Sequence, residues 1–180
     1  MEIKEILYTS IDKHSKYLVS DIAQGKSPEV IRVIYQECED QLDKLAENKS
    51  EALGIFVEGL IHYLLTTALI PSQRKITSNS VYVDIAIPDI KTLNTIPQDA
   101  LIISFPKTND LPTIKNRLEE IVKIQPIKEN IWFVLEDWID IGIRIYTVNN
   151  IGDFPFSNII NDIIGFLTNK KQSKLKLFRI

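Results

Sequence analysis

The sequence predicts an α/β domain, because helical and strand patterns follow one another along one chain of ordinary composition. Apolar residues recur at helical spacing as far as Ile70. After Pro71 they alternate with polar residues or form short continuous runs, as in half-buried and fully buried strands. Helical spacing then returns twice, between and after these runs, and this order of elements is typical of an α/β fold.

Three helices are predicted before Pro71. The first covers residues 2–23. Ser27 can cap the second, and Pro28 suits its first helical position. The third covers residues 50–69. The second helix carries an apolar stripe of Val30, Ile31, Ile34, Cys38, Leu42 and Leu45. The two leading helices therefore form either a hairpin packed on the core or an arm that pairs with a second copy to make a homodimer.

Strands and helices mix in the rest of the chain. The predicted elements are, in order, strands at 75–78, 81–87 and 100–105, a helix at 111–124, strands at 131–135 and 141–148, and a helix at 156–167. The alternation in the second strand places Asp84 on the face opposite Val81, Val83, Ile85 and Ile87. We expect three regions: a helical extension packed on the core (1–49), the α/β core (50–167) and a basic C-terminal tail (168–180).

Composition limits the chemistry. Cys38 is the single cysteine and His14 and His62 are the only histidines, so the chain cannot build an internal disulfide, a thiolate zinc site or a His-rich metal site. No glycine-rich phosphate loop is present. The net charge of −3 argues against a uniformly basic, nucleic-acid-coated surface. No apolar run approaches the roughly 20 residues that span a bilayer, so we expect a cytoplasmic protein without membrane contact.

Two carboxylates stand out as candidates for a divalent metal site, because hard cations prefer oxygen ligands. Glu58 and His62 lie at the edge of the apolar arc of the third helix, and Asp84 lies in the middle of a strand. Structural roles are the alternatives. Glu58 and His62 are spaced as a solvated i,i+4 pair, and Asp84 can accept hydrogen bonds from a loop or pair with Arg74 or Lys75.

Residues 50–148 resemble the core of the PD-(D/E)xK, or restriction-endonuclease-like, superfamily. The resemblance is carried by a helix with a glutamate (Glu58), a β-meander with an aspartate in its second strand (Asp84), and then a helix and a strand. It implies an N-terminal helical hairpin followed by an α-βββ-α-ββ-α core with a mixed sheet. It also implies DNA as a partner and, if the chain is an enzyme, a divergent metal-dependent nuclease that uses Mg²⁺ or Mn²⁺.

The third strand departs from the family pattern. The family places an acid there and a lysine two residues later, whereas this chain has Ser104 and Pro106. Lys107 is one residue further and would point to the other face of a regular strand, unless a bulge at Pro106 re-aims it. Lys91, in the run Pro-Asp-Ile-Lys after the second strand, is the other candidate lysine. The site implied by the resemblance consists of Glu58 and Asp84 as metal ligands and catalytic residues, with Lys107 as the catalytic lysine.

The C-terminal segment resembles the sliding-clamp-binding peptide of DNA replication and repair proteins. The anchors that this resemblance implies are Gln172, Leu175 and Phe178, although Arg179 stands where the motif has a second aromatic residue. The alternatives are an edge strand or a simple basic tail.

These observations leave three hypotheses. The leading one is a nuclease-like domain with a degenerate site, acting as a non-catalytic DNA-binding or recruitment factor in DNA metabolism. The second is an active, divergent nuclease that uses Glu58 and Asp84. The third is a protein-assembly module whose contacts come from the N-terminal helices and the Trp132/Trp138 region.

Overall fold

The computed structural model describes residues 2–45 and 47–177, and of residues 172–177 only the backbone. Its helices are α1 (Ile3–Ala23), α2 (Ser27–Leu45), α3 (Lys49–Thr67), α4 (Ile90–Thr95), α5 (Leu111–Val122) and α6 (Ile159–Leu177), with short 3-10 helices η1 (Pro97–Asp99), η2 (Lys128–Asn130) and η3 (Phe156–Asn158). Its strands are β1 (Gln73–Ser78), β2 (Val81–Ile87), β3 (Leu101–Ser104), β4 (Ile131–Leu135) and β5 (Arg144–Thr147). None of the described helices combines the length and apolar character that crossing a membrane requires.

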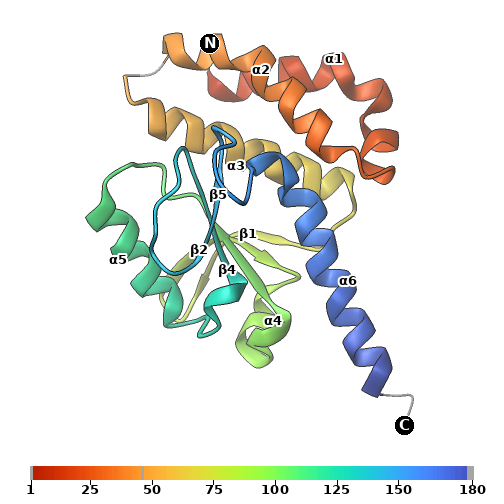
Figure 1. Ribbon diagram of the computed structural model, residues 1–180, viewed down its shortest axis with the longest axis vertical. Coiled ribbons are helices and arrows are strands. Elements are labelled where there is room, and N and C mark those ends of the chain that lie inside the picture. Colours follow the sequence, from red (N-terminus) through yellow and green to blue (C-terminus); the bar gives the residue numbers. More distant parts are fainter. Residues whose placement is uncertain (1, 46, 178–180) are drawn as a thin grey trace.

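The strands form one mixed sheet in the order β1-β2-β3-β4-β5 (Figure 1). The first three strands are an antiparallel meander, and β3, β4 and β5 run parallel. Helix α5 connects β3 to β4 as a crossover. The α/β prediction with a mixed sheet is confirmed.

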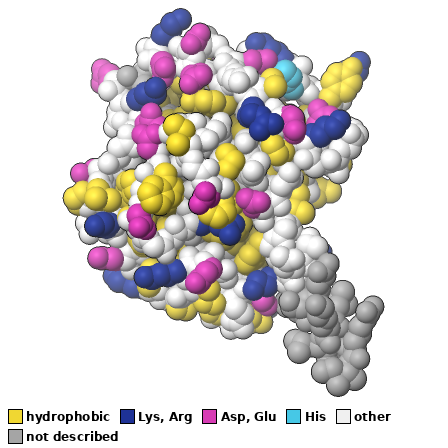
Figure 2. Space-filling view, in the orientation of Figure 1, with side chains coloured by type: hydrophobic (Ala, Val, Ile, Leu, Met, Phe, Trp, Pro, Cys, Tyr) yellow, Lys and Arg dark blue, Asp and Glu magenta, His cyan; other side chains and the backbone are white. Residues whose placement is uncertain are grey.

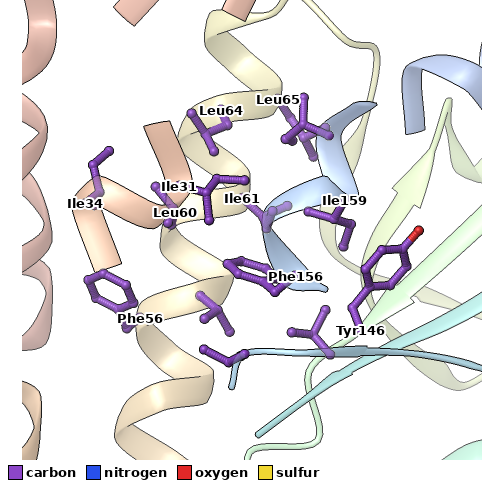
Figure 3. Close-up of a cluster of buried hydrophobic side chains, with 14 of the residues drawn as sticks. Ile31, Ile34, Phe56, Leu60, Ile61, Leu64, Leu65, Tyr146, Phe156 and Ile159 are labelled. Atoms are coloured by element: carbon purple, nitrogen blue, oxygen red, sulfur yellow. The ribbon is translucent and has the colours of Figure 1, made fainter. Parts of the chain in front are cut away.

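The core on one face of the sheet is built around α3. Phe56, Leu60, Ile61, Leu64 and Leu65 of this helix are completely buried, and Figure 3 shows them between α2 and the β5–α6 region. The N-terminal hairpin covers the outer side of α3 (Figure 1). The α2 stripe packs in the same core, where Val30, Ile34 and Cys38 are buried. The alternative of a projecting N-terminal arm is therefore wrong, because these apolar side chains are already covered within the chain.

Helix α5 covers the opposite face of the sheet. Its residues Ile114, Leu118 and Ile121 pack in a second buried cluster with side chains from β3, β4 and β5. The sheet is thus enclosed between two helical layers, which explains why β3 and β4 are buried along their whole length.

Strand β2 changes phase at Asp84. Val81 and Val83 belong to the α5-side cluster, whereas Ile85 and Ile87 belong to the α3-side cluster. The prediction that all four share one face is wrong. The β1 residue at this register position, between the Arg74–Ile85 and Ile76–Val83 pairs, is Lys75, whose φ of 50° is left-handed and interrupts the regular pleat.

Helix α6 continues well beyond the predicted end at residue 167. Its backbone is helical without a break through Leu177, so the edge-strand alternative for the C-terminal segment is wrong over these residues. Gln172 and Leu175 lie in this helix, and Phe178 lies outside the described residues.

Candidate functional site

Glu58 is buried in the third helix and held by two cations. Its side chain is only 4% exposed, with Lys107 Nζ 2.6 Å from Oε2 and Arg74 Nη2 3.4 Å from Oε1. Burial favours the neutral acid, but the Lys107 hydrogen bond and the charges of Lys107, Arg74 and Lys75 outweigh it and lower the pKa of Glu58. Glu58 is therefore an ionised carboxylate whose charge is balanced by Lys107 and Arg74. The expected solvated pair with His62 is wrong, because Glu58 points into the protein.

Lys107 reaches Glu58 through a sharp change of chain direction. Strand β3 ends at Ser104, and Lys107 has a left-handed φ of 59°. The chain crosses α3 at Gly54, where an added Cβ would lie 2.5 Å from Lys107 Cγ and 3.0 Å from Lys107 Cα. The glycine inside the helix therefore makes room for the backbone that delivers the lysine. The chain beyond the strand re-aims Lys107, so the strand-phase argument does not apply to it.

Asp84 is held by β3 and α5. Its Oδ2 accepts hydrogen bonds from Ser104 Oγ at 2.8 Å and from Phe105 N at 2.9 Å, and lies 3.7 Å from Arg117 Nη2. Arg117 Nε also donates to Ser104 Oγ at 3.3 Å. Asp84 Oδ2 and Ser104 Oγ thus both face the guanidinium group of Arg117. Of the structural roles considered for Asp84, the loop hydrogen bond is present, whereas its ionic partner is Arg117 rather than Arg74 or Lys75.

Tyr82 connects the two carboxylate clusters at the surface. Its side chain is 43% exposed, and the guanidinium of Arg117 lies 5.5 Å from its ring centre. Burial and the charges of Asp84 and Glu58 raise the pKa of the Tyr82 phenol, while Lys107 and Arg117 oppose the rise. Because one phenol responds to all four charges, Glu58–Lys107 and Asp84–Arg117 form one electrostatic neighbourhood.

The other predicted lysine lies elsewhere. Lys91 is in the first turn of α4, and the preceding Asp89 caps that helix by accepting a hydrogen bond from Thr92 N at 2.7 Å. These contacts account for the Pro-Asp-Ile-Lys run as a helix start. Among the described residues, Lys91 forms no ion pair with Glu58 or Asp84.

Sequence reasoning missed Arg117. Its only sequence signal is its place beside Leu118 on the apolar side of α5, where a basic side chain has to find a partner. Gly54 was also missed, although a glycine inside a helical pattern is less favourable than alanine and so calls for a packing reason.

This arrangement does not fit a divalent cation. Mg²⁺ is usually bound by one or two carboxylates together with water and substrate phosphate, and a positive side chain next to these carboxylates competes with the ion. Here each carboxylate already faces a basic side chain, and Ser104 supplies a hydroxyl where the family pattern has an acid. Across residues 2–45 and 47–177, no group of three or more His, Cys, Asp or Glu residues could hold a metal ion.

The fold is restriction-endonuclease-like, as predicted. A solved structure described as restriction endonuclease PspGI in complex with substrate DNA matches 94% of this chain and 94% of its own, with a TM-score of 0.63. The two sequences are 16% identical, so this likeness establishes the fold alone. No protein-family model matches the sequence, and no curated protein matches it either.

Proposed function

We propose that this protein is a nuclease-like domain that binds DNA without hydrolysing it. The observation that carries the proposal is the pairing of both candidate carboxylates with basic side chains of the same chain. Glu58 faces Lys107 and Arg74, and Asp84 faces Arg117. The positions that resemble a nuclease site are therefore occupied by internal ion pairs.

Hydrolysis of a phosphodiester by such a site needs a metal-bound water and a lysine that is free to assist it. Lys107 Nζ is engaged at 2.6 Å from Glu58, and Ser104 lacks the charge to bind a metal. The groups that remain can bind, orient and neutralise an anion, but they provide neither a metal-bound water nor a free lysine for hydrolysis.

The fold supports DNA as the partner, since the matching structure is described as a complex with substrate DNA. The net charge of −3 means that contact has to come from a local cluster. Figure 2 shows acidic and basic side chains interspersed over one face rather than a field of one sign. A local cluster contacts few phosphates at once, and we expect modest affinity that weakens with salt.

The test compares binding with cleavage on the same DNA. Fluorescence anisotropy of a labelled duplex should show saturable binding, and prolonged incubation of supercoiled plasmid with Mg²⁺ or Mn²⁺ should leave it intact. Metal-dependent nicking that disappears in Asp84→Asn would establish the divergent nuclease instead. Absence of binding to any DNA would refute the proposal and favour the protein-assembly hypothesis.

The clamp-binding peptide remains a prediction. Gln172 and Leu175 lie on the last turns of α6, and Phe178 is beyond the described residues. Pull-down with a sliding clamp is expected to depend on Phe178, and association unchanged in Phe178→Ala would exclude this recruitment role.

A further inference from the structure

The candidate site carries more positive than negative charge. Four cationic side chains, Arg74, Lys75, Lys107 and Arg117, act on only two carboxylates. The excess positive charge also acts on His62. Burial is the main cause of the lowered pKa of His62, and the charges of Arg74 and Lys75 lower it further. In a chain with net charge −3, this is a local positive cluster.

Lys75 is the unneutralised member of this cluster. It is exposed on β1, its left-handed backbone lies at the register position of Asp84, and its charge reaches both Glu58 and His62. No described carboxylate lies within ion-pair distance of its ammonium group, whereas the other three cations each have one. Lys75 can therefore meet an external anion without losing an internal partner.

Two guanidinium groups of the cluster also have unused donors. Arg74 Nε and Arg117 Nη2 are buried atoms that have no hydrogen-bond acceptor among the described residues. A buried donor without an acceptor is unfavourable, and in proteins such groups are normally satisfied by water or a ligand.

We propose that Lys75 and the neighbouring Arg74 bind a backbone phosphodiester of DNA directly, so that basic side chains take the place of a divalent metal. This inference rests on the proposed function and names its contact. It follows that DNA affinity does not depend on a divalent metal. The phosphate is bound along the strand, so a terminal phosphate is not required.

The experiment measures affinity for a short hydroxyl-ended duplex, and for the same duplex with 5′-phosphates, over a series of salt concentrations. Wild-type protein is expected to bind equally well in EDTA and in Mg²⁺ at matched ionic strength. Lys75→Asn removes the charge and keeps a residue that tolerates a left-handed φ. It should weaken binding and reduce the slope of log K against log salt by about 0.9, the value for one lost phosphate contact.

Lys44→Gln is the matched control, because Lys44 is an exposed lysine in the last turn of α2. Its salt slope should equal that of the wild type. A requirement for Mg²⁺, a requirement for a 5′-phosphate, or an unchanged slope in Lys75→Asn would overturn this inference while leaving DNA binding intact. Loss of all DNA binding by the wild type would instead refute the proposed function itself.

Discussion

Replacing Lys107 should destabilise the protein far more than replacing Lys123, although the two lysines lie at the same distance from their carboxylate partners. Lys107 Nζ lies 2.6 Å from Glu58, and Lys123 Nζ lies 2.6 Å from Glu120. The carboxylates differ in burial, with side chains 4% exposed for Glu58 and 51% for Glu120. Removing the partner of a buried charge is far more unfavourable than removing one half of a surface pair.

Lys107→Met is expected to lower the free energy of unfolding by about 2–3 kcal/mol, below the full range for breaking a buried pair because Arg74 remains beside Glu58. This corresponds to a melting temperature about 4–12 °C lower for a domain of this size. Lys123→Met should lower the free energy of unfolding by less than about 1 kcal/mol. Urea denaturation and thermal melting of both variants measure the difference.

The pH dependence identifies the cause. The pKa of Glu58 is lowered in the folded protein, so ionised Glu58 stabilises the fold above the unfolded pKa of 4.5. This contribution is lost as the pH falls through the folded pKa. In Lys107→Met, burial remains while the main lowering contacts are gone, so the pKa of Glu58 rises. The stability gap between wild type and variant should be full at pH 7 and shrink as the pH falls through the raised pKa of Glu58 in the variant. A gap that is independent of pH, or equal losses in the two variants, would show that Glu58 is not a buried carboxylate stabilised by Lys107.

Two further variants test the contacts that form the site. Gly54→Ala should destabilise the protein and displace Lys107, although alanine is intrinsically favoured over glycine in helices by about 1 kcal/mol. Gly165→Ala should stabilise the protein, because no atom lies within 4 Å of the added Cβ. Thermal melting of the two variants gives opposite signs if the close approach is real, and stabilisation by both would contradict it. Asp84→Ala leaves the Phe105 amide and the Ser104 hydroxyl without their acceptor and the Arg117 guanidinium without its carboxylate, so we expect a loss of about 2–4 kcal/mol in urea denaturation. A loss under about 0.5 kcal/mol, the size of an ordinary surface substitution, would show that Asp84 is not an internal partner.

The order of elements could be predicted because it depends on local periodicity. The apolar spacing in α3 and the runs in β3 and β4 follow directly from burial on one or both faces. The face of β2 could not be predicted in the same way. Its change of phase coincides with the left-handed backbone of Lys75 in the neighbouring strand, a feature that the β2 sequence does not contain.

The carboxylates of the site could be predicted, but their partners could not. Glu58 and Asp84 stand out because an acid on or beside an apolar face requires an explanation. Which cation supplies it depends on tertiary contacts: Arg117 comes from the crossover helix, and Lys107 from a turn that forms only where Gly54 lets the chain pass. Because of these long-range contacts, the two carboxylates that suggested a metal site form internal ion pairs instead.

Calorimetric titration of Mn²⁺ into the wild-type protein and into Asp84→Asn shows whether Glu58 and Asp84 are available to a metal ion. If the carboxylates are neutralised by Lys107, Arg74 and Arg117, the two titrations should be alike and show no saturable site. Saturable Mn²⁺ binding by the wild type that is lost in Asp84→Asn would contradict the account, because it would mean that the carboxylates converge on a metal despite their basic partners.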